Sequence, residues 1–301
     1  MSQRLRRSEL STPATSEKMA RKAAASDADL VFLDLEDSVA PAEKVRARDL
    51  AVKALLELDW GKKTRAVRVN AAETQWAYED VITVIEGAGS KIDLLVLPKV
   101  KAPRDVWFFE TLLEQLEAKL GLEHKIGLEA LIEETEALAC VEEIARCSDR
   151  LEALILGVGD LSASQGMKLG GIGGSNERYP GDVWHYARTR MVVACRAAGI
   201  DAIDGPYANF RNPEGYLREA TWAAILGFVG KWAIHPSQIE LAHQVYSPSE
   251  EEIANARKMI AAYEEAEAAG QGAAAVDGVM IDAATARIFQ VIVDQADLIA
   301  Q

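Results

Sequence analysis

The sequence predicts an α/β fold, a (β/α)8 barrel at residues 1–243 that is followed by a helical extension at residues 244–301. Three observations support this prediction. Short apolar runs alternate with helical patterns, eight such runs occur, and nearly every run ends in a polar or charged residue. A doubly wound open sheet is the competing fold. The count of eight strands and the polar strand exits favour the barrel.

The predicted strands are short runs rich in Val, Leu and Ile, bounded by turn residues or by the start of a helical pattern. They are Ser8–Thr12, Asp29–Leu35, Arg65–Val69, Asp93–Leu97, Leu128–Ile132, Leu154–Gly157, Ala202–Asp204 and Gly230–Ile234. Helical patterns separate them at Ser16–Ala25, Pro41–Leu58, Trp76–Gly87, Pro103–Leu120, between Glu133 and Leu154, at Val183–Ala198 and at Glu214–Leu226. Strands joined by helices are parallel, so their C-terminal ends meet at one face, where catalytic groups of such barrels collect.

The extension begins with an N-cap signal at Ser249, before a highly charged helix at Glu250–Ala269. A flexible link is predicted at Gly270–Gly278 and a final helix at Ile281–Ala300, with Asp282 near its start. Two helices added to a complete barrel are typical of a lid, an arm or an oligomerisation element.

Composition excludes several classes of partner. The net charge of −14 argues against a nucleic-acid or anionic-membrane surface, and no apolar run is long enough to cross a bilayer. The three cysteines form no CxxC pair, which is typical of a reduced, cytoplasmic protein. The N-terminal cluster of Arg4, Arg6 and Arg7 is expected to be a solvated arm.

Two acids follow neighbouring predicted strands. Glu133 comes after Leu128–Ile132, and Asp160 comes after Leu154–Gly157. Because the two strand ends share one edge of the sheet, both carboxylates are expected to project from that edge. Carboxylate oxygens at this spacing suit Mg²⁺, with Mn²⁺ as the alternative. The other interpretation is a pair of solvated loop acids.

Further polar residues follow other predicted strands. They are Glu36, Asp37, Arg68, Asn70, Lys99, Asp204 and His235. Arg68 offers a fork of donors for a carboxylate or enolate oxygen, although a buried ion pair with Glu36 or Asp37 is the structural alternative. Lys99 is expected to be a structural partner of the strand-end acids. His235 precedes a proline and has the simpler alternative of capping the strand end.

Six motifs occur together and in order. They are DLEDSV (Asp34–Val39), RVN (Arg68–Asn70), LPKV (Leu97–Val100), LIE (Leu131–Glu133), LGVGDLSASQGM (Leu156–Met167) and GKWAIHPSQ (Gly230–Gln238). This set resembles the HpcH/HpaI aldolase and citrate lyase β-subunit family. GMKLGGIGG (Gly166–Gly174) makes the sequence more similar to the L-malyl-CoA and β-methylmalyl-CoA lyase branch.

The resemblance implies a barrel with a C-terminal lid and a Mg²⁺-dependent, reversible Claisen-type cleavage. L-malyl-CoA would give glyoxylate and acetyl-CoA, and β-methylmalyl-CoA would give glyoxylate and propionyl-CoA, with coenzyme A as part of the substrate. Citramalyl-CoA lyase, malyl-CoA thioesterase and a citrate-lyase-β-like subunit of a complex are the alternatives. It also implies a homo-oligomer, a trimer or hexamer, in which a neighbouring subunit supplies the lid.

The resemblance also implies roles for individual residues. Glu133 and Asp160 match the metal ligands, and Arg68 matches the arginine that contacts the substrate oxygens. Asp282 matches the lid acid/base, although a simple helix N-terminal acid is the alternative. Glu36 and Asp37 are expected to orient Arg68 or metal-bound water. Contacts with the CoA substrate are implied for Lys22, Gly159, Asp160, Ile234 and His235.

Four positions depart from the family pattern, and the first is Ala14, which follows Pro13 where Gly is frequent. Ser16 stands where a basic residue is frequent, so the contacts with the CoA phosphate are expected to differ. Glu134 replaces a usual Ser or Thr, and Ala137 replaces a usual Gly. None of these changes removes a residue that the reaction needs.

Overall fold

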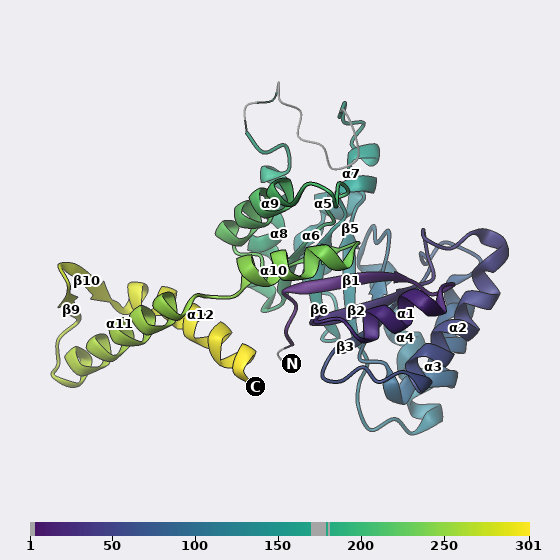
Figure 1. The fold of residues 1–301 in the computed structure, drawn as a ribbon, viewed down its shortest axis with the longest axis horizontal. Coiled ribbons are helices and arrows are strands. Elements are labelled where there is room, and N and C mark those ends of the chain that lie inside the picture. Colours follow the sequence, from purple (N-terminus) through teal and green to yellow (C-terminus); the bar gives the residue numbers. More distant parts are fainter. Residues whose placement is uncertain (1–3, 170–178, 180) are drawn as a thin grey trace. The chain divides into compact units, whose positions relative to one another are not determined.

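The computed structural model describes residues 4–169, 179 and 181–301, and within them it confirms the predicted barrel (Figure 1). All strand pairs of the barrel are parallel, the strands follow one another in chain order, and β1 closes the barrel against β8. The strands are β1 (Ser8–Pro13), β2 (Leu30–Asp34), β3 (Thr64–Arg68), β4 (Leu94–Leu97), β5 (Gly127–Ile132), β6 (Leu151–Leu156), β7 (Asp201–Asp204) and β8 (Gly230–Ala233).

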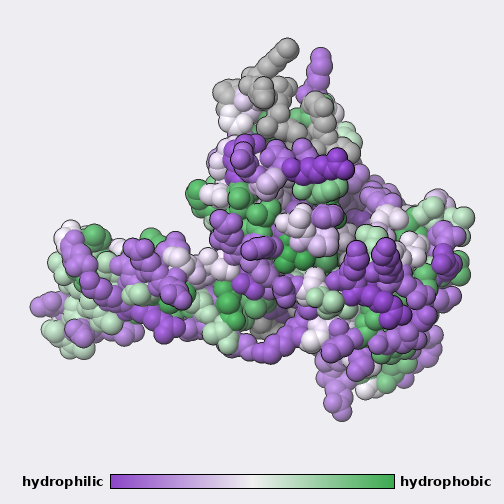
Figure 2. Space-filling model, in the orientation of Figure 1, coloured by the Kyte–Doolittle hydropathy of each residue, from purple (hydrophilic) through white to green (hydrophobic). Residues whose placement is uncertain are grey.

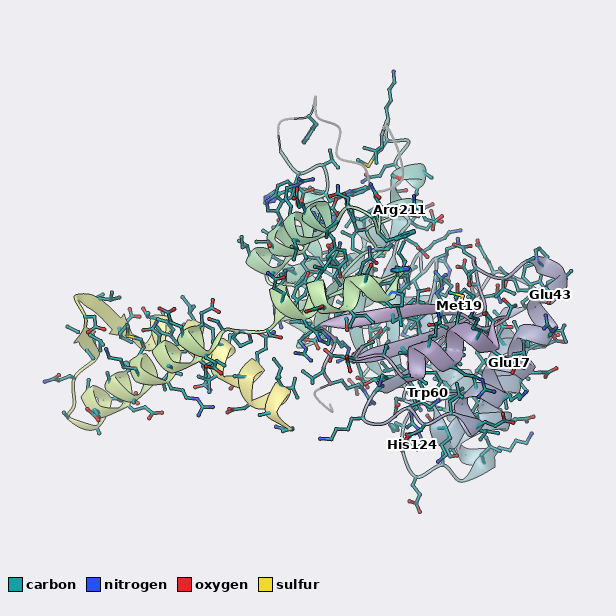
Figure 3. The ribbon with its side chains drawn as sticks, in the orientation of Figure 1. Glu17, Met19, Glu43, Trp60, His124 and Arg211 are labelled. Carbon is teal, nitrogen blue, oxygen red and sulfur yellow. The ribbon has the colours of Figure 1, made fainter. Side chains whose placement is uncertain are left out.

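Helices follow the strands of the barrel, and Figure 3 labels Glu17 and Met19 on the first of them, α1. They are α1 (Glu17–Ala24), α2 (Lys44–Glu57), α3 (Ala77–Ala88), α4 (Pro103–Leu120), α5 (Thr135–Ala139), α6 (Val141–Ala145), α7 (Val158–Ser164), α8 (His185–Ala198), α9 (Pro213–Leu226) and α10 (Ile239–Tyr246). Short 3-10 turns are η1 (Pro41–Glu43), η2 (Gly89–Lys91) and η3 (Pro236–Gln238).

Two connections differ from the prediction. The single helix expected after β5 is two short helices, because Cys140 leaves the helical conformation at φ −123° and ψ 29°. After β6 the chain forms α7 at once, a short helix that was not predicted. Residues 170–174 of the glycine-rich motif lie outside the described residues.

Side chains from seven strands fill the barrel. The interior cluster comprises Leu30, Phe32, Ala66, Leu94, Val96, Leu131, Ala153, Ile155, Ile203 and Trp232. The members on one strand are two residues apart, which is the alternation that places every second side chain on one face. Phe32 and Trp232 form the aromatic layer of this core, with ring centroids 4.5 Å apart.

The N-terminal arginines are not a solvated arm. Arg6 is buried, and its guanidinium pairs with Glu129 at 2.8 Å, Glu152 at 2.5 Å and Asp201 at 3.2 Å. These three acids come from β5, β6 and β7, so Arg6 joins three strands. A buried guanidinium is retained here because each of its three nitrogens reaches a carboxylate.

The chain divides after His243 into two compact units, the barrel at residues 6–243 and a second unit that contains residues 244–301. The second unit consists of α11 (Glu250–Ala268), β9 (Ala273–Val276), β10 (Val279–Asp282) and α12 (Ala283–Ala300). The flexible link predicted here is wrong, because β9 and β10 form an antiparallel hairpin.

The hairpin follows from its Asp-Gly turn. Asp277 and Gly278 both have positive φ, 52° and 80°, as a two-residue turn between right-twisted strands requires. Hydrophobic surface is exposed on this unit (Figure 2), and Val279, Met280, Ile288 and Val291 contribute to it. None of the helices in the described ranges is long and apolar enough to cross a bilayer.

Candidate active site

Strand alternation brings charged residues into the mouth of the barrel. On β2, Leu30 and Phe32 belong to the interior core, so Asp34 faces the same interior. On β5, Leu131 faces inward, and Glu133, two residues later and just beyond the end of the strand, lies on the same face. The alternation of side chains along a strand therefore places two acids, Asp34 and Glu133, above the layer formed by Phe32 and Trp232.

Arg68 lies in this mouth and pairs with Asp34, its register partner on β2. Nε donates to Oδ1 at 2.7 Å, and a terminal nitrogen donates to Oδ2 at 2.6 Å. The guanidinium lies 5.8 Å from the ring centroid of Phe32 and 5.5 Å from that of Trp232. Burial opposes ionisation of Asp34, but the charge and hydrogen bonds of Arg68 outweigh it and lower the Asp34 pKa.

The partner of Arg68 was predicted only in part. Glu36 Oε2 lies 3.2 Å from the remaining terminal nitrogen of Arg68, but Asp34 makes the bidentate pair. Asp37 is exposed and pairs with Lys99 at 3.2 Å. Sequence reasoning missed Asp34, although its position two residues after Phe32 on an apolar strand was the signal that it faces inward.

Lys99 follows β4 and reaches two of the three acids of the DLEDSV motif, Glu36 and Asp37. Its Nζ donates to Glu36 Oε1 and to Asp37. Burial alone would lower the pKa of the ammonium, but the hydrogen bond and charge of Glu36 raise it. Lys99 is therefore a charged partner of the strand-end acids, as expected, rather than a neutral amine.

Glu133 is 3% exposed and is held on two sides. The backbone N–H of Lys99 donates to its Oε1 at 2.7 Å. On the other side lies Gly157, where an added Cβ would stand 2.3 Å from the Cβ of Glu133 and 2.6 Å from its Oε2. Burial raises the pKa of Glu133 to about 8, and the charge of Asp160 also raises it.

Asp160 lies in the first turn of α7, where it is half-buried, rather than directly at a strand end. The start of α5 is tied to the end of α7, because Thr135 N donates to Ser164 Oγ at 2.9 Å. This bond links the segment that follows Glu133 to the helix that carries Asp160.

The donor set fits a hard divalent cation. Glu133 and Asp160 supply oxygens, and the carboxylate of Glu133 is desolvated without a cationic side chain bonded to it in the described chain. Among the described residues, no three His, Cys, Asp or Glu side chains cluster as a metal site. If Glu133 and Asp160 were the protein ligands, positions would remain for water and substrate, which is typical of Mg²⁺.

The residues expected to contact CoA are spread over several elements. Gly159 is in the same turn as Asp160, Ile234 is 38% exposed after β8, and Lys22 is exposed in the last turn of α1. His235 stacks on Phe210, with centroids 4.7 Å apart and planes inclined by 15°.

The loop that carries Phe210 lies between β7 and α9, where Figure 3 labels the next residue, Arg211. The guanidinium of Arg211 lies 5.8 Å from the Phe210 ring centroid. Ser237 N donates to Nδ1 of His235 at 3.2 Å, so the histidine also caps η3. The stacked ring and the cap together fix the orientation of the imidazole.

The positions that depart from the family pattern have local roles. Ser16 is the N-cap of α1 and accepts from Met19 N at 3.3 Å. Glu134 is the N-cap residue of α5, and Ala137 is fully buried on that helix.

Two strand-exit residues are not part of the site. Asn70 is buried, where it accepts from Lys44 at 2.7 Å and donates to Asp80 at 2.6 Å. Asp204 is fully buried between Arg188 and Lys231, with contacts from 2.5 to 3.1 Å. Both residues satisfy buried cations, which is a structural role.

Asp282 belongs to the second unit, where it is the N-cap of α12. Its Oδ1 accepts from the N–H and the hydroxyl of Thr285, both at 2.8 Å. These hydrogen bonds lower the pKa of Asp282. The helix N-terminal interpretation is thus realised in the structure, and an acid/base role needs a different environment for this carboxylate.

Comparison with known proteins covers nearly the whole chain. The HpcH/HpaI aldolase/citrate lyase family profile matches residues 7–236. An L-malyl-CoA/β-methylmalyl-CoA lyase of Cereibacter sphaeroides is 44% identical over 299 residues, which cover 96% of this chain and 93% of the relative. A (3S)-malyl-CoA thioesterase of the same species is 36% identical over 278 residues, covering 92% of this chain and 89% of the relative.

A solved structure is similar over the same length. The CitE protein of Mycobacterium tuberculosis, in complex with magnesium, acetoacetate and coenzyme A, has a TM-score of 0.73 at 30% identity. The match covers 96% of this chain and 97% of that one. The resemblance carried by the six motifs is confirmed, and the chain belongs to the HpcH/HpaI aldolase/citrate lyase family.

Proposed function

We propose that this protein is a Mg²⁺-dependent CoA-ester lyase. It would cleave L-malyl-CoA, or β-methylmalyl-CoA, reversibly to glyoxylate and acetyl-CoA, or propionyl-CoA. The observation that carries the proposal is the pair of carboxylates, Glu133 and Asp160, beside the fixed guanidinium of Arg68 at one mouth of the barrel. The lyase relative, similar over nearly its full length, supports the same activity.

Glu133 and Asp160 are the residues that would hold the cation. A bound Mg²⁺ supplies Lewis acidity to the hydroxyl and carboxylate oxygens of a malyl group. The chain's own contribution is an oriented ligand: the Lys99 amide donates to Glu133, which lies where a side chain at position 157 would collide with it. Asp160 is half-buried, and it is therefore more accessible to solvent than Glu133.

Arg68 stabilises negative charge on the substrate. Breaking the carbon–carbon bond leaves the electron pair on the thioester as an enolate, whose oxygen needs a positive partner. The bidentate contact with Asp34, the contact with Glu36 and the aromatic layer below hold the guanidinium in place before substrate arrives. Such preorganisation avoids reorganisation of the site during the reaction.

Asp282 is proposed to protonate the enolate carbon in cleavage and to remove the proton in condensation. In the described chain this carboxylate is half-buried and its hydrogen bonds with Thr285 lower its pKa, so proton donation requires a less polar site. A homo-oligomer, trimer or hexamer, in which Asp282 acts on a neighbouring barrel would provide that environment. A cytoplasmic location is part of the same proposal.

A thioesterase is the second candidate, because a thioesterase relative matches 92% of this chain. Hydrolysis of the thioester releases malate and free coenzyme A, and it needs no acid to protonate a carbanion. The retained Asp282 therefore favours carbon–carbon cleavage. Citramalyl-CoA cleavage uses the same groups and is separated from malyl-CoA cleavage by substrate choice alone.

One experiment distinguishes these activities. Purified protein is incubated with Mg²⁺ and malyl-CoA or citramalyl-CoA, and the products are identified by mass spectrometry. Acetyl-CoA with glyoxylate indicates the lyase, whereas free coenzyme A with malate indicates the thioesterase. The reverse reaction uses glyoxylate with acetyl-CoA or propionyl-CoA, and Glu133→Gln is the matched inactive control. Absence of any CoA adduct and of any cleavage would rule out the lyase.

A further inference from the structure

Lys99 combines two features that are unusual in one residue. Its backbone is left-handed, with φ at 49°, and Asp277 is the only other non-glycine residue in the described ranges with a positive φ. In this conformation its backbone N–H donates to Oε1 of Glu133 at 2.7 Å. Residues other than glycine adopt positive φ rarely, and such positions cluster at functional sites.

The direction of the Lys99 amide depends on that backbone conformation. If residue 99 adopted a backbone conformation in the β region, its peptide plane would rotate. Its N–H would then no longer point at Oε1 of Glu133. Glu133 also lies so near Gly157 that a Cβ added there would stand 2.3 Å from its Cβ and 2.6 Å from its Oε2, so little space remains for the carboxylate to shift in that direction. The amide and the glycine therefore select one orientation of the buried carboxylate.

The side chain of Lys99 acts at a different place. Its ammonium donates to Oε1 of Glu36, while Oε2 of the same carboxylate faces Arg68 at 3.2 Å. Glu36 thus lies between two cations and is held from both sides. Removal of the ammonium leaves Oε1 of Glu36 without this donor, while Asp37 N still donates to Oε2 at 2.8 Å, and it thereby weakens one constraint on the position of Arg68.

We propose that Lys99 is a positioning residue that joins the two halves of the site. Its backbone amide sets the orientation of Glu133, and its ammonium holds Glu36 against Arg68. This inference rests on the proposed function, in which Glu133 binds the cation and Arg68 binds the substrate. The two contacts use different parts of one residue, so they respond to different substitutions.

The test compares substitutions that differ in tolerance of positive φ. Lys99→Met removes the ammonium and keeps an unbranched side chain, and Lys99→Gly removes the ammonium and favours positive φ. Lys99→Ile also lacks the ammonium, but its β-branched side chain disfavours the left-handed conformation. Lys99→Thr is a smaller β-branched variant, for use if the isoleucine variant does not fold.

Cation affinity is measured without substrate, by calorimetry with Mg²⁺ and by the paramagnetic signal of Mn²⁺. We expect Lys99→Gly and Lys99→Met to bind at least as tightly as the wild type, because a nearby positive charge is lost. Lys99→Ile and Lys99→Thr are expected to bind the cation about tenfold or more weakly than Lys99→Met. The reason is that a β-branched residue disfavours the positive φ that directs the amide at Glu133. Equal affinity of the branched and unbranched variants would overturn the role of the amide.

Steady-state kinetics test the ammonium. We expect Lys99→Met to raise KM for the CoA ester about tenfold at saturating Mg²⁺, with a smaller change in kcat. The reason is that Glu36, which pairs with Arg68, is no longer held by the Lys99 ammonium. An unchanged KM would overturn this half of the inference. If the wild-type protein binds neither Mg²⁺ nor Mn²⁺, the proposed function itself fails, and that outcome is distinct from failure of the Lys99 variants.

Discussion

Arg68 and Asp34 pair directly across β2 and β3, with hydrogen bonds of 2.7 and 2.6 Å and no more than 9% of either side chain exposed. The pair closes the top of the aromatic layer and leaves the guanidinium in the mouth of the barrel. An arginine held by a bidentate partner keeps its donors in one plane, so it can present a fixed charge to a substrate. The pair is therefore both a structural contact and a condition for the proposed chemistry.

Asp34→Asn is expected to lower kcat/KM about a hundredfold, because Arg68 is no longer held by two charged hydrogen bonds. The same change leaves a buried guanidinium partly unpaired, and we expect the unfolding free energy to fall by about 2–4 kcal/mol. Steady-state kinetics and urea unfolding measure the two effects. The matched control is Asp93→Asn, which breaks the bidentate pair with Arg65 at the opposite end of β3.

Arg65 and Asp93 are 26% and 20% exposed, so loss of their pair is expected to cost about 1 kcal/mol or less and to leave kcat/KM unchanged. If the two variants have equal kinetics, Asp34 is only a structural partner of Arg68.

Gly157→Ala is expected to weaken Mg²⁺ binding by about tenfold or more. The added Cβ would stand 2.3 Å from the Cβ of Glu133, so the carboxylate must shift away from its place on the Lys99 amide. Calorimetric titration with Mg²⁺ measures the loss. Gly272→Ala is the matched control, because no atom lies within 4 Å of its added Cβ. Wild-type affinity in the Gly157 variant would mean that Glu133 is not a metal ligand.

Asp282→Asn separates the capping role of this residue from the acid/base role. Asparagine caps a helix about as well as aspartate, so we expect the melting temperature to stay unchanged. Loss of the acid/base is expected to lower kcat by about two to four powers of ten, with Mg²⁺ affinity preserved. Calorimetry and turnover assays report these quantities.

Ser249→Ala provides the converse control. It removes the hydroxyl that accepts from Glu252 N at 3.2 Å and donates to the Glu252 carboxylate at 2.7 Å at the start of α11, which should reduce stability by about 1 kcal/mol without a comparable loss of turnover. Full activity of Asp282→Asn would show that this carboxylate only caps α12.

The buried acid Glu9 gives a pH dependence of stability. Burial raises its pKa well above the ordinary value of 4.5, and the charge of Glu129 adds to this. Above pH 4.5 the folded protein therefore keeps a proton that the unfolded chain releases. The unfolding free energy must fall as pH rises from 4.5 towards the folded pKa, with a slope of up to about 1.4 kcal/mol per pH unit from this group.

Glu9→Gln is expected to flatten this slope, because the amide cannot ionise while its oxygen can still accept from the Trp232 indole. Urea unfolding at pH 5, 6 and 7 measures the difference from the wild type. Glu57→Gln, on the exposed side of α2, is the control and should leave the slope unaltered. An identical pH dependence in Glu9→Gln and the wild type would contradict a protonated Glu9.

The sequence by itself determined the order of strands and helices and hence the barrel. Apolar runs at regular spacing leave few ways to bury their surface, and parallel strands force their C-terminal ends onto one face. That constraint was sufficient to select Glu133, Asp160 and Arg68 as candidates for one site. The hairpin at β9 and β10 was missed, although the turn signal Asp277-Gly278 lies between the two strands.

Only the tertiary structure decided which strand-exit residues are partners. Asn70 and Asp204 satisfy the same sequence criterion as Glu133, yet they are bonded to buried cations, Lys44 for Asn70 and Arg188 for Asp204. Whether a side chain enters the mouth or packs behind the sheet depends on where its strand ends and on which neighbours meet it. Those neighbours come from distant parts of the chain, which local patterns cannot specify.

The same reason explains why Arg6 was predicted wrongly and Asp34 was missed. Three acids from β5, β6 and β7 meet at Arg6 only once the barrel has closed. Asp34 pairs with Arg68 because the register of β2 against β3 places them side by side. Charge desolvation makes such pairs obligatory in a folded interior, and the partner of each charge is set by the packing of the strands.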